Sequence, residues 1–191
     1  WREKICEWSY QVVDHFDINR EVVAVSLSYL DRYLSTKRVN KKIFQLAAMT
    51  TLYLAMKLYS KKSQPIGSLI ELSRGYFEKD HVEKMEQSIF RELSWRLHPP
   101  TALSMVKHLM IELPPLPGQV EGERRLKHDI TEVSRFLTEL SVCDYFFVPR
   151  RPSAIAVAAI LCAIEIQLDT ESSSILSRLF LNSVNGLLPL Y

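Results

Sequence analysis

The 191-residue sequence predicts an all-α protein made of two tandem helical bundles, each built around a central apolar helix. Three observations favour this fold. The sequence lacks the sustained polar–apolar alternation that is typical of β-hairpins. Apolar residues recur instead at helical spacing. An amphipathic segment, a short linker and an apolar segment occur at residues 20–59 and again at 124–168. Because only a short stretch follows the second apolar segment, we expect the second bundle to be incomplete. The sequence begins without an initiator methionine, so we also expect the chain to be part of a longer protein.

The first bundle is expected over residues 1–98 and contains five helices. The third helix, Ile43–Tyr59, is apolar almost all round, which places it at the centre of the bundle. A short fourth helix over Gly67–Arg74 ends at Gly75, because glycine suits a left-handed stop. The fifth begins at about Asp80 as its N-cap. The first two helices are defined by the apolar stripes Ile5, Trp8, Val12 and Phe16, and Val22, Val25, Tyr29, Leu30 and Tyr33.

The second bundle is expected over residues 99–191. Pro99-Pro100 breaks the fifth helix, and Thr101 can cap a new one. A loop rich in proline and glycine follows at Pro114–Glu123. A helix over Arg124–Cys143 then leads to the second apolar helix, within residues 150–168.

Charge and cysteine content restrict the class of protein. There are 24 basic and 22 acidic residues, a net charge of +2, and the basic pairs are interleaved with acids. This balance argues against a nucleic-acid partner. Cys6, Cys143 and Cys162 are odd in number and far apart, which is typical of free thiols in a reducing compartment.

Motifs for catalysis, cofactors and metals are absent from the sequence. It contains no phosphate loop, nucleophile elbow, zinc-protease motif or dinucleotide fingerprint. The five histidines show no ligand spacing with the cysteines. Both apolar segments are interrupted by polar or charged residues and fall short of a membrane span. We therefore expect no enzyme activity, cofactor, metal site or membrane segment.

Four stretches of the first bundle carry a recognisable pattern. They are WREKICEW at residues 1–8, SYLDRYLS at 28–35, QLAAMT and LAMKL within 45–58, and KMEQSIFRELSW at 84–95. Together they resemble the cyclin box. PPTALSMV at 99–106 is similar to the junction that follows the first box of cyclins. FLTELS at 136–141 and RPSAIAVAA at 151–159 are similar to the second box. The resemblance covers about residues 1–168 in the family's order.

The resemblance implies a regulatory subunit that binds and activates a cyclin-dependent protein kinase and so controls the cell cycle. Cyclins have no catalysis of their own. They pack against a mobile helix of the kinase, which seats the kinase's own Lys–Glu ion pair and frees its activation loop. The resemblance also implies an intracellular location, in the nucleus, the cytoplasm or both.

Lys57 and Glu86 match the lysine and glutamate with which cyclins hold kinase backbone. A lysine at this point of an apolar helix is costly to bury alone, so we expect it to meet Glu86 at the edge of the core. The alternative is an ordinary surface pair, with a lysine whose stem is buried and a solvated glutamate. Cyclins usually follow the lysine with an aromatic and two acids, whereas here the sequence is Leu58-Tyr59-Ser60.

A second site is implied by the groove in which many cyclins dock Arg-x-Leu motifs of substrates or inhibitors. Here Lys4 replaces a small aliphatic residue, and Gln11 replaces an acid that would attract the motif's arginine. The alternative is that Ile5 and Trp8 only pack the first helix on its bundle. The groove positions correspond to Trp1, Ile5, Trp8, Gln11, Phe44 and Gln45.

Two further inferences complete the expectations from sequence. Asp31 and Arg32 match a cyclin pair that ties helices together, so we expect a structural role for them. Tandem cyclin-like bundles also occur in transcription factor IIB and in retinoblastoma-type pockets, which bind DNA and peptides respectively. A transcription adaptor of that kind is the alternative function, and it predicts a continuous basic face with salt-sensitive binding.

Overall fold

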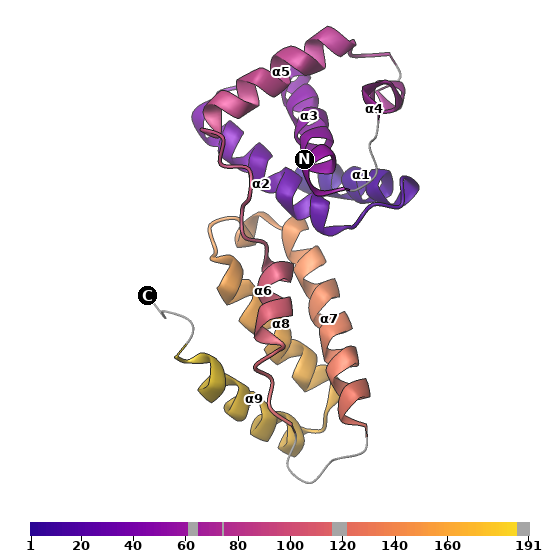
Figure 1. The fold of residues 1–191 in the computed structure, drawn as a ribbon. Helices are drawn as coiled ribbons and strands as arrows, with labels where there is room; N and C mark the ends of the chain where they lie inside the picture. The colour runs from indigo at the N-terminus through magenta and orange to yellow at the C-terminus, as the bar shows by residue number, and fades with distance from the viewer. Residues whose placement is uncertain (61–64, 74, 116–121, 187–191) are drawn as a thin grey trace. The chain divides into compact units, whose positions relative to one another are not determined.

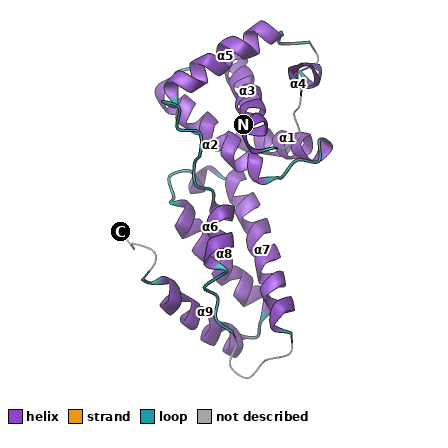
Figure 2. Ribbon diagram, in the orientation of Figure 1, coloured by secondary structure: helices purple, strands orange, loops and turns teal. Residues whose placement is uncertain are grey.

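The computed structural model of the chain describes residues 1–60, 65–73, 75–115 and 122–186. Every regular element in these residues is a helix, and the described part contains no β-strand (Figure 2). The all-α prediction is therefore confirmed. None of the described helices is long and apolar enough to span a bilayer.

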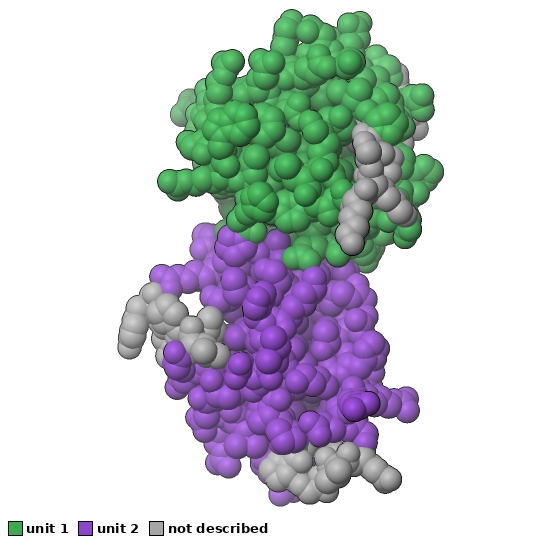
Figure 3. All heavy atoms as spheres, in the orientation of Figure 1, with its two compact units in different colours: residues 1–99, 142–148 green, residues 100–141, 149–191 purple. Residues whose placement is uncertain are grey.

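The chain forms two compact units. Unit 1 contains residues 1–99 and 142–148, and unit 2 contains residues 100–141 and 149–191 (Figure 3). Each unit has its own apolar core. The chain therefore returns to the first unit for a short segment before it completes the second.

Unit 1 is organised around α3, whose ten buried side chains lie on all sides of the helix. Helices α2 and α5 pack against α3, and α1 packs against α2 (Figure 1). Asn40 caps α3 by accepting a hydrogen bond from the backbone N–H of Ile43. The helices are α1 (Arg2–His15), α2 (Glu21–Thr36), α3 (Lys41–Tyr59), α4 (Ile66–Leu72) and α5 (Lys79–Glu92).

The N-terminus of α5 differs from the prediction. Asp80 was expected to cap it, but the helix begins at Lys79, with Glu78 at the N-cap. The backbone N–H of Glu78 donates to Nδ1 of His81 over 3.1 Å. Asp80 lies in the first turn, where an acid suits the helix dipole, and accepts from Lys84. The predicted fourth helix largely corresponds to α4, although Arg74 lies outside the described residues.

Unit 2 consists of α6, α8, α9 and nearly all of α7. α8 packs against α6 and α9. Thr101 caps α6 as predicted, accepting from the backbone N–H of Ser104 over 2.9 Å. Residues 116–121 of the predicted loop lie outside the described residues. The helices are α6 (Ala102–Leu109), α7 (Glu123–Cys143), α8 (Pro152–Gln167) and α9 (Thr170–Val184).

α9 was not assigned from the sequence. Asp169 caps it by accepting from the backbone N–H groups of Glu171 and Ser172. Leu176, Phe180 and Val184 are buried at intervals of one turn. The aspartate cap and this spacing are visible in the sequence, but the five serines in the helix obscure the apolar pattern.

The segment that returns to unit 1 is held by α1. Nε of Arg2 and Sγ of Cys6 both donate to the carbonyl oxygen of Val142, over 2.8 and 3.4 Å. Beyond it, a short 3₁₀ helix, η1 (Tyr145–Phe147), is capped by Asp144. This segment therefore fills part of the surface of α1 from more than a hundred residues away in the chain.

Candidate functional site

The structure brings Lys57 and Glu86 together in unit 1. Nζ of Lys57, in the last turn of α3, lies 2.7 Å from Oε1 of Glu86 in the middle of α5. The lysine side chain is 43% exposed and that of the glutamate is 17% exposed. The ion pair thus lies at the edge of the core and remains open to solvent on the lysine side.

Helix geometry accounts for this meeting. Val82, Met85 and Ile89 form the buried face of α5, and Glu86 follows Met85 on the flank that faces α3. Lys57 follows the buried Met56 at the end of α3, where a cation also suits the negative end of the helix dipole. Burial of the apolar faces therefore fixes both backbones, and the charged ends meet at the rim.

The ion pair retains unused hydrogen-bonding capacity. An ammonium carries three donors and a carboxylate about four acceptor positions. Within the described part of the chain, the bond between Lys57 and Glu86 is the one hydrogen bond that either side chain makes. The pair can therefore donate to a partner's carbonyl groups and accept from its N–H groups at the same time.

Aromatic side chains extend the surface beside this pair. The ammonium of Lys57 lies 5.2 Å from the ring centroid of Tyr53. Phe90, one turn after Glu86 on α5, stacks on Trp95 with centroids 4.7 Å apart, and Trp95 is 70% exposed. Phe90 is half-buried and packs against the core of unit 1. The spacing from Glu86 to Phe90 was visible in the sequence, but the stacking on Trp95 was not.

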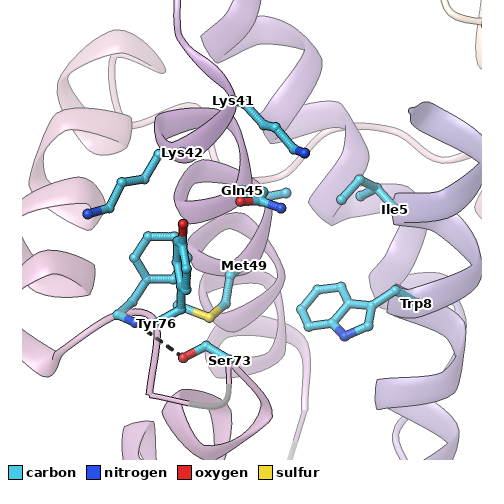
Figure 4. Close-up of a pocket in the computed structure, with 10 residues that line it drawn as sticks. Ile5, Trp8, Lys41, Lys42, Gln45, Met49, Ser73 and Tyr76 are labelled. Carbon is cyan, nitrogen blue, oxygen red and sulfur yellow. Dashed lines mark hydrogen bonds between the residues drawn. The ribbon is translucent and has the colours of Figure 1, made fainter.

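A pocket of about 590 Å³ in unit 1 is lined by residues of α1 and α3 and by Ser73, Tyr76 and Phe77. Ile5 and Trp8 form one side, Tyr76 the opposite side, and Met49 lies between them (Figure 4). The backbone N–H of Phe77 donates to Oγ of Ser73 over 3.4 Å, which holds the turn at this wall. This volume is within the usual range for ligand pockets.

The predicted groove residues divide between two pockets. Ile5, Trp8 and Gln45 line the larger pocket. Trp1 and Phe44 line a smaller neighbouring pocket of about 370 Å³, with ring centroids 6.4 Å apart. Gln11 is exposed and is not among the described residues that line either pocket.

Lys41 and Lys42 were not predicted as pocket residues, but both line the larger one. The ammonium of Lys41 lies 5.1 Å from the ring centroid of Trp1, and that of Lys42 lies 5.8 Å from the ring centroid of Tyr76. Two adjacent lysines are typical of a solvated helix end, so the sequence gives no sign of this pocket. Trp1 and Tyr76 are distant from these lysines in the sequence, so the contacts can be recognised only in the folded structure.

Asp31 and Arg32 join α2 to its surroundings. Oδ1 of Asp31 accepts from Nη1 of Arg2 on α1 over 2.6 Å, and Nη2 of Arg32 donates to the carbonyl oxygen of Arg96 over 2.9 Å. Burial raises the pKa of the Asp31 carboxyl, although the hydrogen bond from Arg2 acts in the opposite direction. Burial also lowers the pKa of the Arg32 guanidinium. These contacts link elements of the fold and lie apart from the lining of both pockets.

No group of three or more potential metal ligands occurs among the described residues. Cys6, Cys143 and Cys162 form no disulfide among the described residues, and Cys6 is completely buried. The surfaces described above therefore consist of an ion pair with aromatic neighbours and an apolar pocket with two cations.

Two family models match the chain. The model described as "Cyclin, N-terminal domain" matches residues 1–98, and the one described as "Cyclin, C-terminal domain" matches residues 119–181. The solved structure of a viral cyclin from herpesvirus saimiri superposes with a TM-score of 0.68 at 18% identity. This match covers 98% of this chain and 85% of the viral one. At that identity the structural likeness supports the fold.

Curated relatives show the same similarity. The G2/mitotic-specific cyclin-B2 of Oryzias latipes is 29% identical over 168 residues, which is 88% of this chain and 40% of that protein. Cyclin-A1-4 of Oryza sativa subsp. japonica is 27% identical over 171 residues, which is 90% of this chain and 46% of that protein. The chain spans less than half the length of these relatives.

Proposed function

Because the chain belongs to the cyclin family, we propose that it binds and activates a cyclin-dependent protein kinase through the Lys57–Glu86 pair and the surface beside it. The observation that carries this proposal is the 2.7 Å ion pair between two helices at the edge of the core, which is open to solvent on the lysine side. The expected cellular consequence is control of the cell cycle, in the nucleus or cytoplasm.

The proposed mechanism is a shift in the conformational population of the kinase. A protein that binds the active conformation more tightly than the inactive one raises the active fraction by that difference in affinity. The Lys57–Glu86 pair would hold the kinase backbone through charge-assisted hydrogen bonds. Exposed Trp95, stacked on Phe90, offers apolar area of the kind that concentrates binding energy at interfaces.

The same proposal includes peptide docking at the larger pocket, which would bring substrates or inhibitors to the kinase. The Arg-x-Leu motif stays a prediction from the resemblance. The lining supplies the apolar surface that such a motif needs, but it contains no carboxylate among its described residues. The charges therefore favour a different peptide.

The test is capture of kinases from a cell extract on the immobilised chain, followed by mass spectrometry and a phosphotransfer assay. Lys57→Ala or Glu86→Ala should weaken binding of the captured kinase by about 2–5 kcal/mol, because truncating one side leaves the other charge unpaired in the interface. This corresponds to a loss of roughly 30-fold or more in affinity.

Lys84→Ala is the matched control. Lys84 lies on the same helix and forms a 2.7 Å ion pair with Asp80, but both side chains are more than 60% exposed. Its loss should leave kinase binding unchanged. Capture of no kinase by the unmodified chain would refute the proposed function. Equal binding by Lys57→Ala, Glu86→Ala and unmodified protein would refute the site.

The transcription-adaptor alternative has no specific structural support. It predicts a continuous basic face, whereas acidic and basic side chains pair along α5 and α7 in the described residues. Retention on a DNA column that decreases steeply with salt would favour this alternative.

A further inference from the structure

We propose that the larger pocket of unit 1 binds an acidic peptide segment, in which an apolar side chain is flanked by aspartate or glutamate. The inference rests on the proposed function only for the identity of the protein that carries the peptide, a substrate or inhibitor of the kinase. The choice of an acidic peptide rests on the apolar walls and the charges of the pocket itself.

The apolar part of the pocket can hold the anchor side chain. Ile5 and Trp8 on α1 are half-buried, so their inner parts support the helix and their outer parts face the pocket. Met49 on α3 is almost completely buried and lies between the two walls (Figure 4). An aliphatic or aromatic side chain would remove these surfaces from water.

The charged part of the pocket is positive. Lys41 and Lys42 are both exposed and lie over the aromatic rings of Trp1 and Tyr76. Neither lysine has a carboxylate partner within the described residues. None of the ten residues drawn in the pocket is acidic (Figure 4). A peptide carboxylate would therefore find two cations at the rim, whereas a peptide arginine would face like charges.

These lysines are poorly placed for the stability of their own helix. They occupy the first two positions of α3, the positive end of the helix dipole, where acids are favourable. The first turn of α3 contains no acidic residue to offset them. Carboxylates supplied by a partner would interact favourably with these ammonium groups.

The charged side chains of α1 lie outside the described lining of the pocket. Glu3 and Glu7 are exposed on α1 but are not among the described lining residues, and Lys4 adds a further exposed cation to the helix. Gln45 contributes a neutral amide within the pocket. The pocket therefore combines an apolar interior with a cationic rim.

The test is selection from a display library of random twelve-residue peptides against the full chain, followed by affinity measurements on synthetic peptides. We expect enriched peptides to contain an apolar residue beside aspartate or glutamate. Lys41→Glu and Lys42→Glu together should weaken their binding at least tenfold, and added salt should also weaken it. Trp8→Ala should reduce binding of the same peptides.

The matched control is the double variant Lys79→Glu, Lys84→Glu, which makes the same change of charge at two exposed positions of α5. It should leave peptide affinity unchanged within twofold. Circular dichroism checks that the Lys41→Glu, Lys42→Glu variant is folded. Acids at the start of α3 suit its dipole, so this variant should unfold at the same temperature as the unmodified chain or higher.

The remaining outcomes overturn the inference. They are enrichment of arginine-containing peptides, no enrichment, or acidic peptides that bind the Lys41→Glu, Lys42→Glu variant as tightly as the unmodified chain. Phosphoserine peptides that bind more than tenfold more tightly than their aspartate counterparts would assign the pocket to phosphorylated segments instead. Kinase capture is measured without the peptide, and it should survive Lys41→Glu and Lys42→Glu. Failure of this inference is thus distinguishable from failure of the proposed function.

Discussion

At the scale of single residues, the hydroxyl group of Ser9 is a defect in the core of unit 1. Ser9 is completely buried on α1, and its Oγ has no hydrogen-bond partner among the described residues. An unpaired buried hydroxyl costs about 1–3 kcal/mol, and alanine is also the better helix former. Ser9→Ala should therefore raise the free energy of unfolding by about 1 kcal/mol or more, measured by denaturant titration.

Ser26→Ala is the matched comparison for Ser9→Ala. Ser26 is equally buried on α2, but its Oγ donates to Oγ1 of Thr51 on α3 over 3.3 Å. Both substitutions bring the same gain in helix propensity, so the difference between them isolates the hydroxyl group. Ser26→Ala should be the less stable variant by about 1 kcal/mol. A reversed order would show that the Ser9 hydroxyl is satisfied in solution.

The Cys6 thiol should make stability depend on alkaline pH. Burial, with a smaller contribution from Cys143, raises the pKa of Cys6 from 9.0 to about 12. Between these values the unfolded chain releases a proton that the folded chain keeps, so stability is lost as pH rises from about 9 towards 12. The stability difference between the unmodified chain and Cys6→Ala should change by about 1.4 kcal/mol per pH unit in that window.

The control for Cys6 is the same comparison between pH 6 and 8, where both states hold the proton and the difference should be constant. Tyr29 also has a pKa raised by burial, but its contribution is common to both proteins. A constant difference up to pH 11 would contradict the assignment of a buried neutral thiol to Cys6.

The sequence predicted the Lys57–Glu86 pair of the candidate site but not the lysines of the pocket. The meeting of Lys57 and Glu86 was foreseen because the two residues match a lysine–glutamate pair of cyclins. The position of each residue beside the apolar face of its helix agreed with that match. The cationic rim was not foreseen. Lys41 and Lys42 look like an ordinary helix end until Trp1 and Tyr76 are brought beside them.

At the scale of elements, the start of α6 depends on Thr101. The hydroxyl of Thr101 accepts from the Ser104 backbone, and the Ser104 hydroxyl accepts in return from the Thr101 backbone. Thr101→Ala should lower the free energy of unfolding by about 0.5–2 kcal/mol, because a helix N–H loses its partner. Thr101→Ser keeps the oxygen and should lose much less. Equal losses of stability in Thr101→Ala and Thr101→Ser would show that the methyl group of Thr101, and not its hydroxyl, stabilises the fold.

Element-level prediction succeeded where the apolar signal was strong. The long apolar run gave α3 its central place, and Pro99-Pro100 followed by threonine correctly located the start of α6. The predicted N-cap of α5 was wrong. Glu78 is the N-cap residue and forms a capping box with His81, whereas Asp80 lies within the first turn. The serine-rich sequence of α9 weakened an apolar spacing that is clear once burial is known.

At the scale of the whole molecule, Arg2 connects three distant parts of the chain. It pairs with Asp31 on α2 and donates to the carbonyl of Val142. Arg2→Ala should therefore speed amide hydrogen exchange both in α2 and in residues 144–148. The free energy of local opening in these segments should fall by about 1–3 kcal/mol, because half-buried groups lose a charged partner.

The comparison for Arg2 is Arg20→Ala. Arg20 pairs with Asp14 at an exposed site, with side chains 41% and 51% exposed. Loss of this exposed ion pair should leave the hydrogen-exchange rates of residues 144–148 unchanged. Exchange in α8 should be unaffected by Arg2→Ala. A uniform increase across both units, or none in residues 144–148, would contradict this account.

The return of residues 142–148 to unit 1 could not be predicted from the sequence. Helical periodicity identifies elements and their apolar faces, but it carries no information about which distant segment covers α1. The repeated pattern suggested two consecutive bundles. The contacts of Val142 with Arg2 and Cys6 depend on the folded backbone and leave no local signal.

The discontinuity of unit 1 also sets an order of events during synthesis. Helices α1 to α5 leave the ribosome well before residues 142–148, and at typical elongation rates residues 100–141 take roughly 2–8 s to translate. During that interval Cys6 and the Arg2 side chain lack the backbone that later covers them. The newborn N-terminal half would therefore carry an uncovered thiol and apolar surface, open to oxidants and to chaperones, for a time fixed by the speed of translation.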